Sequence, residues 1–90
     1  MPHSFDDIKN RYIATFPAKE MDLRNAWGEK DVSSLRQLLH KLCGSSGSYG
    51  FDKLSSLCRD ALTLLEKQPL PIDAINETLK AIYQEFMTNR

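Results

Sequence analysis

Cysteine, glycine and long apolar runs are all scarce in this sequence. The two cysteines, Cys43 and Cys58, form no Cys-X-X-Cys pair, so neither a disulfide scaffold nor a paired-cysteine site is indicated. The longest apolar run spans only a few residues, far short of the ~20 that a membrane-spanning helix needs. The first residues contain no apolar segment typical of a signal peptide. We therefore expect a cytoplasmic protein with no membrane partner.

Excess charge of either sign is also absent. Twelve Lys and Arg balance 12 Asp and Glu, and the pI is about 6.7. Domains that bind duplex nucleic acid are usually markedly basic, so nucleic acid is not expected as a partner. No run of alternating β-branched residues indicates a strand. A chain of 90 residues suits one domain with one modest core, which we expect over residues 1–90.

Helical periodicity and helix-ending residues fill the chain instead. Ser4 and Asp31 are suited to cap helices, Pro17 to a first turn, and Gly28 to a helix end. The predicted helices cover about 5–15, 17–28, 31–48, 51–67 and 71–88. Each predicted helix has one apolar stripe. The stripe of 5–15 is Phe5, Ile8 and Tyr12, and that of 17–28 is Leu23, Ala26 and Trp27. The stripe of 71–88 is Ile72, Ile75, Leu79, Ile82 and Phe86.

Short links between these segments favour an all-α fold, an antiparallel four-helix bundle with a short additional N-terminal helix. The fourth member of the bundle is the segment 17–28, and 5–15 covers one end. Trp27 is expected in the core, although an exposed Trp27 would suit a partner surface.

One histidine stands in the middle of a predicted helix, on the face opposite the core. A helix turns about 100° per residue, which puts the apolar stripe of residues 31–48 on the far side of His40. That stripe is Leu35, Leu38, Leu42, Ser45 and Tyr49. Within about 60° of His40 lie Ser33, Arg36, Gln37, Cys43, Gly44 and Gly47.

Small residues follow the histidine at helical spacing. Only four glycines occur in the chain, and three of them lie within residues 44–50. An interior glycine costs a helix about 1 kcal/mol relative to alanine, so Gly44 and Gly47 need a compensating role. Free access to the His40 imidazole for a large partner would be one. The alternative is a fraying helix end beside an incidental surface histidine.

The run H-K-L-C-G-S-S-G-S-Y-G-F-x-x-L-x-x-L-C resembles the signature of histidine-containing phosphotransfer (HPt) domains. The family motif is approximately H-x-L-K-G-S-[SA]-x-x-x-G, followed by a helix with a leucine stripe. The residues that fit it are His40, Leu42, Gly44, Ser45, Ser46, Gly50, Leu54 and Leu57. An acidic cap about nine residues before the histidine, here Asp31, is also similar, and the resemblance covers roughly residues 22–66.

The resemblance implies a phosphorelay intermediate. His40 would accept a phosphoryl group from a receiver-domain aspartyl phosphate and pass it to another receiver aspartate. A neutral imidazole is a suitable nucleophile near pH 7. The expected partners are the receiver domain of a response regulator, a hybrid sensor histidine kinase, or both. The receiver would supply the aspartate and Mg²⁺, so we expect a monomeric carrier with no cofactor, no metal of its own and no enzymatic turnover.

One position departs from the family pattern. The family often has lysine three residues after the histidine, where this chain has Cys43. Arg36, one turn before His40, and Lys41 are candidates to replace the lysine charge, although Lys41 also suits a solvated surface cation. Gln37 is a candidate to hydrogen-bond the ring or the phosphoryl group.

Other interpretations stay open. The cysteine at position 43 is compatible with a non-phosphorylated interaction module that binds a receiver or kinase domain. A helical bundle unrelated to signalling is a weaker possibility. A metal site combining His40 and Cys43 with Cys58 or His3 is not favoured, because these residues lack the spacing of zinc ligands. We expect Cys58 in the core, Cys43 exposed, and His3 without a role.

Overall fold

The computed structural model describes residues 5–89, and all regular structure in that part of the chain is helical. The helices are α1 (Phe5–Ile13), α2 (Phe16–Gly28), α3 (Val32–Ser48), α4 (Asp52–Leu65) and α5 (Ile72–Thr88). Their bounds lie within two residues of the predicted segments. Within residues 5–89, no helix is long and apolar enough to cross a membrane.

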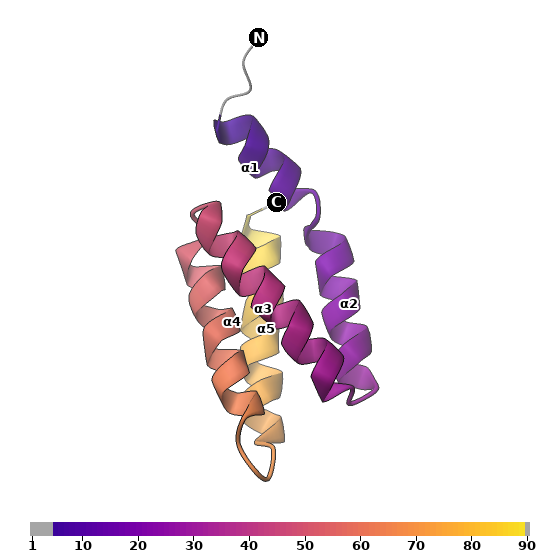
Figure 1. Ribbon diagram of the computed structural model, residues 1–90. Coiled ribbons are helices and arrows are strands. Elements are labelled where there is room, and N and C mark those ends of the chain that lie inside the picture. The colour runs from indigo at the N-terminus through magenta and orange to yellow at the C-terminus, as the bar shows by residue number, and fades with distance from the viewer. Residues whose placement is uncertain (1–4, 90) are drawn as a thin grey trace.

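Helices α2 to α5 form an antiparallel four-helix bundle, and α1 projects from one end of it (Figure 1). The closest packing is between α3 and α4, followed by α4 and α5, and α2 closes the ring against α3 and α5. The molecule is therefore elongated, with extents of 52 × 21 × 20 Å. The predicted bundle with a short additional N-terminal helix is confirmed.

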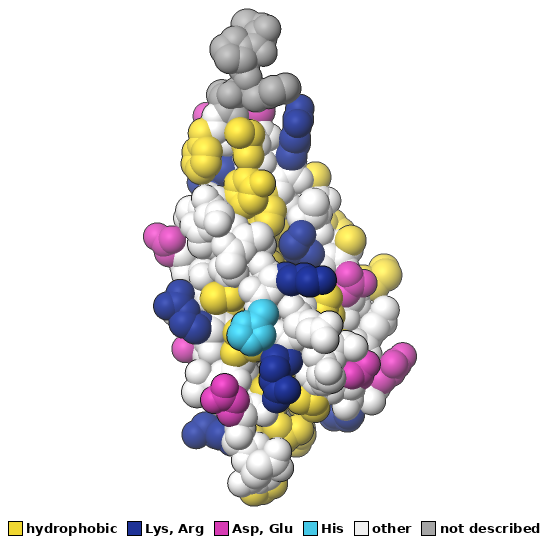
Figure 2. Space-filling model, viewed as in Figure 1, with side chains coloured by type: hydrophobic (Ala, Val, Ile, Leu, Met, Phe, Trp, Pro, Cys, Tyr) yellow, Lys and Arg dark blue, Asp and Glu magenta, His cyan; other side chains and the backbone are white. Residues whose placement is uncertain are grey.

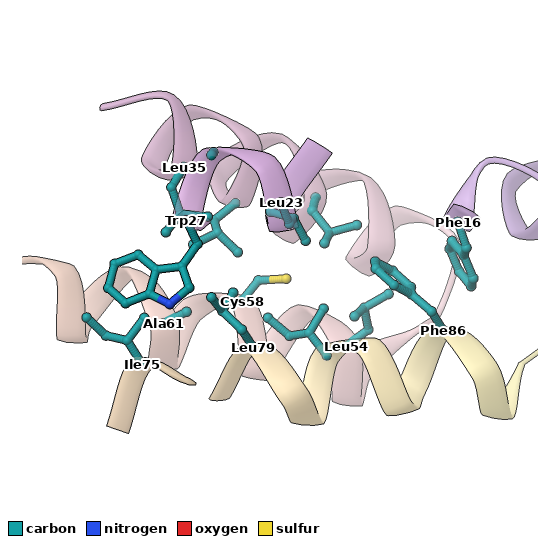
Figure 3. Close-up of a cluster of buried hydrophobic side chains, with 14 of the residues drawn as sticks. Phe16, Leu23, Trp27, Leu35, Leu54, Cys58, Ala61, Ile75, Leu79 and Phe86 are labelled. Carbon is teal, nitrogen blue, oxygen red and sulfur yellow. The ribbon is translucent and has the colours of Figure 1, made fainter. Parts of the chain in front are cut away.

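Side chains from all four bundle helices fill one continuous core (Figure 3). Trp27 closes it at one end and Phe16 and Phe86 at the other. Fully burying one such side chain contributes about 1.5–3 kcal/mol to folding. The indole N–H of Trp27 donates a hydrogen bond of 2.6 Å to Asn76 Oδ1, and only 8% of Trp27 is exposed. Trp27 is thus a core residue, and so is Cys58, as predicted.

The apolar stripe of α3 is rotated from the predicted one. Leu35 and Leu42 are buried as expected, but Leu38, Ser45 and Tyr49 are only half-buried. Leu39 and Ser46 are buried in their place. The reason is that α4 packs more extensively on α3 than α2 does, which turns the covered face toward α4. Inside the core, the Ser46 hydroxyl donates a hydrogen bond of 2.6 Å to the Leu42 carbonyl, so it is not left without a partner.

The prediction for the N-terminal helix was right in extent and wrong in burial. Tyr12 is buried, but 57% of Phe5 and 38% of Ile8 are exposed, because α1 extends beyond the bundle. Pro17 lies in the first turn of α2 as expected. The predicted cap Ser4 lies outside the described residues.

The turns on either side of α3 fix its position. Asp31 caps α3 through Oδ1, which accepts a hydrogen bond from the Ser34 N–H at 3.1 Å, as predicted. Gly28 is the last residue of α2, as predicted, and Lys30, two residues later, has the left-handed conformation with φ +54°. Gly50 (φ +83°) ends α3, and the Phe51 N–H then reaches back to the Ser46 carbonyl at 2.8 Å.

Candidate functional site

His40 lies in the middle of α3 and is exposed. Among the described residues, 5–89, no hydrogen bond or ion pair reaches its imidazole. Figure 2 shows the histidine side chain on an open face of the molecule, with Lys or Arg side chains above, below and to the left of it. Both ring nitrogens are therefore available to a partner. The predicted exposure of His40 is thus confirmed, although the buried face of α3 differs from the predicted one.

The two glycines that follow His40 differ in their surroundings. A Cβ added to Gly44 would meet nothing within 4 Å, whereas one added to Gly47 would lie 3.4 Å from Ser55 Oγ on α4. Packing therefore explains part of the need for a small residue at Gly47 but none of it at Gly44. The open surface one turn beyond His40 results from Gly44.

Cys43 was expected to be exposed, and the structure corrects this. It is half-buried and packs toward α4. Its Sγ lies 3.6 Å from Ser55 Oγ, and Ser55 Oγ donates a hydrogen bond of 2.9 Å to the Cys43 carbonyl. The rotation of α3 toward α4 is the physical cause. The side chain at position 43 therefore faces α4.

The two predicted cations lie on opposite sides of the histidine face. Arg36 is exposed one turn before His40, and its Nη2 is 3.5 Å from the Leu65 carbonyl at the end of α4. A helix C-terminus is partly negative, which favours this placement of a guanidinium. Lys41 turns the other way and lines the boundary between α2 and α3. Of these two cations, Arg36 is thus the one on the α4 side of His40.

Gln37 lies beside α2 and not over the imidazole. It lines a groove of about 320 Å³ between α2 and α3, together with Leu38 and Lys41. A second groove of about 320 Å³ continues along these helices past Lys19, Leu42 and Ser45. His40 is not among the lining residues of either groove. The exposed histidine therefore lies outside both grooves, an arrangement suited to contact with another protein.

The cysteines do not assemble a metal site with His40. Cys58 is fully buried, and burial raises the pKa of its thiol to about 12. Within the described part of the chain, no three His, Cys, Asp or Glu side chains are grouped so that they could hold a metal ion. His3 lies outside the described residues.

Sequence reasoning missed the contribution of α4 to this face. Ser55 is 5% exposed and contacts Cys43, and Arg59 Nη2 lies 3.4 Å from Ser55 Oγ. The polar Ser55 within the leucine stripe of α4 was the available signal. Its partner could not be read from the sequence, because the rotation of α3 was not known.

The geometry and the motif agree with a comparison against protein families. The model of the Hpt domain family matches residues 7–88, nearly the whole chain, so the chain belongs to the Hpt domain family. Domains of this family act as phosphotransfer carriers in two-component phosphorelays, where they interact with receiver domains and kinases. No curated protein and no solved structure matches the chain significantly.

Proposed function

We propose that His40 is the phospho-acceptor of this domain and that the chain carries a phosphoryl group between two receiver aspartates. The lone pair of His40 Nε2 forms the new N–P bond while the O–P bond of the aspartyl phosphate breaks. The aspartate leaves as a carboxylate. The neutral imidazole keeps its proton on Nδ1 during this attack. The return step, toward a second aspartate, is the same reaction in reverse.

The observation that supports this proposal best is the open space around an unpartnered imidazole. His40 has no hydrogen-bond partner among residues 5–89, and nothing lies within 4 Å of the position that a Gly44 Cβ would take. A carrier must expose its nucleophile on a surface that a partner can cover. The receiver would bring the aspartate, Mg²⁺ and the positioning groups, so this chain needs no catalytic pocket of its own.

Charge around the site suits a phosphorylated state. Phosphorylation adds nearly two negative charges, and a guanidinium is the side chain best suited to bind phosphoryl oxygens. We assign this role to Arg36, which is exposed one turn before His40. We assign Lys41, which lies on the α2 side, to contact with the receiver surface. Gln37 is assigned to the same docking surface, since it lies beside α2.

The second candidate is an interaction module that binds a receiver without carrying phosphate. Cys43 at the usual lysine position is the observation in its favour. The accessible histidine argues against it, since a purely binding surface does not require a free imidazole.

Phosphotransfer from a panel of pre-phosphorylated receiver domains tests the proposal. We expect one receiver to label the wild type rapidly, with a label that is stable in alkali, lost in acid and mapped to His40. His40→Gln should abolish labelling, and His3→Gln, at the other histidine of the chain, should leave it intact. Labelling that persists in His40→Gln would contradict the proposal. Tight receiver binding without labelling would support the interaction module.

A further inference from the structure

The cation missing from position 43 has a counterpart on the neighbouring helix. We infer that Arg59 of α4 binds the phosphoryl group on His40 and supplies the charge that lysine at position 43 supplies in the family. This inference rests on the proposed function, since it needs a phosphoryl group at His40. It concerns a residue outside the family motif.

The levels at which α3 and α4 face each other place Arg59 beside His40. The two helices run antiparallel, joined by the tight turn at Gly50. Ser55 lies alongside Cys43 and Gly47. Arg59 lies one turn after Ser55 along α4. His40 lies about one turn before Cys43 along α3. A turn of either helix advances about 5.4 Å, so the two positions stay at the same level.

Contacts of the Arg59 side chain point in the same direction. Its Nη2 lies 3.4 Å from Ser55 Oγ, and that oxygen is 3.6 Å from Cys43 Sγ. The guanidinium is thus separated from the Cys43 side chain by a single hydroxyl. A lysine at position 43 would hold its ammonium in this same region between α3 and α4.

Exposure and charge allow Arg59 to move from Ser55 to a phosphoryl group. Arg59 is exposed, and its 3.4 Å contact with Ser55 is long for a hydrogen bond. Bidentate pairing with phosphoryl oxygens is shorter and stronger. Arg36, whose Nη2 is near the Leu65 carbonyl, approaches from the preceding turn of α3. The phosphoryl group would therefore lie between one guanidinium on each helix.

Phosphoramidate tests this without a receiver, because it phosphorylates an imidazole directly: its P–N bond breaks, ammonia leaves, and the N–P bond forms at His40. We expect Arg59→Ala to lower the labelling rate about fivefold, the size typical of one partly exposed charge contact. Arg59→Lys should retain most of the rate. Lys80→Ala removes a cation from the groove between α2 and α5 and should retain all of it.

The decisive variant is Cys43→Lys in the Arg59→Ala background, which should restore the rate. Circular dichroism and thermal unfolding establish that each variant is folded. If Arg59→Ala unfolds the protein, two other variants test the inference. A retained labelling rate in Arg59→Lys and a raised labelling rate in the single variant Cys43→Lys would support it. Wild-type rates in a folded Arg59→Ala would overturn it while leaving the carrier function standing. Absence of His40-dependent labelling in the wild type would instead count against the proposed function.

Discussion

The hydroxyl of Tyr12 and Oγ of Ser45 lie 2.6 Å apart, and this hydrogen bond joins the N-terminal helix to the helix that carries His40. The Tyr12 ring also stacks on Tyr49, with the ring centroids 4.3 Å apart. Burial raises the pKa of Tyr12, against a smaller lowering effect of the Ser45 hydrogen bond. The hydroxyl therefore keeps its proton at neutral pH. The C-terminal end of α1 is anchored even though Phe5 and Ile8 are exposed.

Tyr12→Phe removes this hydrogen bond and keeps the stacked ring. We expect the free energy of unfolding to fall by about 1 kcal/mol, the typical net contribution of one hydrogen bond. For a domain of this size, that lowers the melting temperature by about 4–8 °C. Thermal unfolding followed by circular dichroism measures it. Tyr83→Phe is the control, since the half-buried Tyr83 ring stays beneath Arg24, and equal losses in both variants would contradict the assignment.

Gly44→Ala should stabilise the protein and impair its partner contact. The added Cβ meets nothing within 4 Å, so the helix gains up to about 1 kcal/mol from losing an interior glycine. The same methyl group narrows the approach to His40, and we expect transfer from a phosphorylated receiver to slow about tenfold or more. Labelling by phosphoramidate, a much smaller donor, should change little.

Gly47→Ala is the matched comparison for this prediction. Its Cβ would lie 3.4 Å from Ser55 Oγ, so it should stabilise the helix less than Gly44→Ala does. Melting temperatures and receiver transfer rates measured side by side separate the two glycines. Wild-type transfer by a stabilised Gly44→Ala would show that Gly44 does not serve docking.

Helix positions and the exposure of His40 could be predicted from local signals. Asp31 and Pro17 mark helix starts through chemistry that depends only on nearby residues, and the structure confirms both. The helical spacing of the leucines predicted the fold class, because an apolar stripe along each helix must be buried against other helices. The family match over residues 7–88 agrees with the motif centred on His40.

Features that depend on contacts between helices could not be predicted in this way. The Cys43 side chain is half-buried because α3 is rotated about its axis toward α4. Helical periodicity shows which residues share a face, but it does not determine how that face is turned relative to the neighbouring helices. The contact of Arg59 with Ser55 follows from the same packing. The left-handed residue after α2 was also missed, since a lysine gives no local sign of a positive φ.

Lys30 holds a conformation that glycine adopts more easily. Its φ is +54°, while its ammonium donates to the Trp27 carbonyl at 3.0 Å and lies 4.1 Å from the Trp27 ring centroid. Lys30→Gly and Lys30→Ala both lose these contacts, and only the glycine relieves the backbone. We expect Lys30→Gly to have a free energy of unfolding about 1 kcal/mol higher than that of Lys30→Ala, measured by urea unfolding. Equal stabilities would show that the backbone at this position is not strained.

Asp31 makes the stability of α3 depend on pH. The side-chain and backbone hydrogen bonds from Ser34 hold the pKa of this carboxyl below its ordinary value, against a smaller effect of burial. A carboxyl with a lowered folded-state pKa stabilises the protein fully above its unfolded-state pKa, near 3.9, and loses that contribution as the pH falls through the folded-state value. The stabilisation is therefore present at neutral pH and is lost in acid.

Asp31→Ala should therefore unfold more easily than the wild type at neutral pH, and the difference should shrink below about pH 4. Urea unfolding at a series of pH values measures this. Asp60→Ala removes an exposed carboxylate from the middle of α4 and should not reproduce the pattern. Asp31→Asn keeps a side-chain oxygen that can cap the helix, so it should retain most of the stability and lose the dependence on pH. A wild-type advantage over Asp31→Ala that is as large near pH 2 as at neutral pH would mean that the cap acts without its charge.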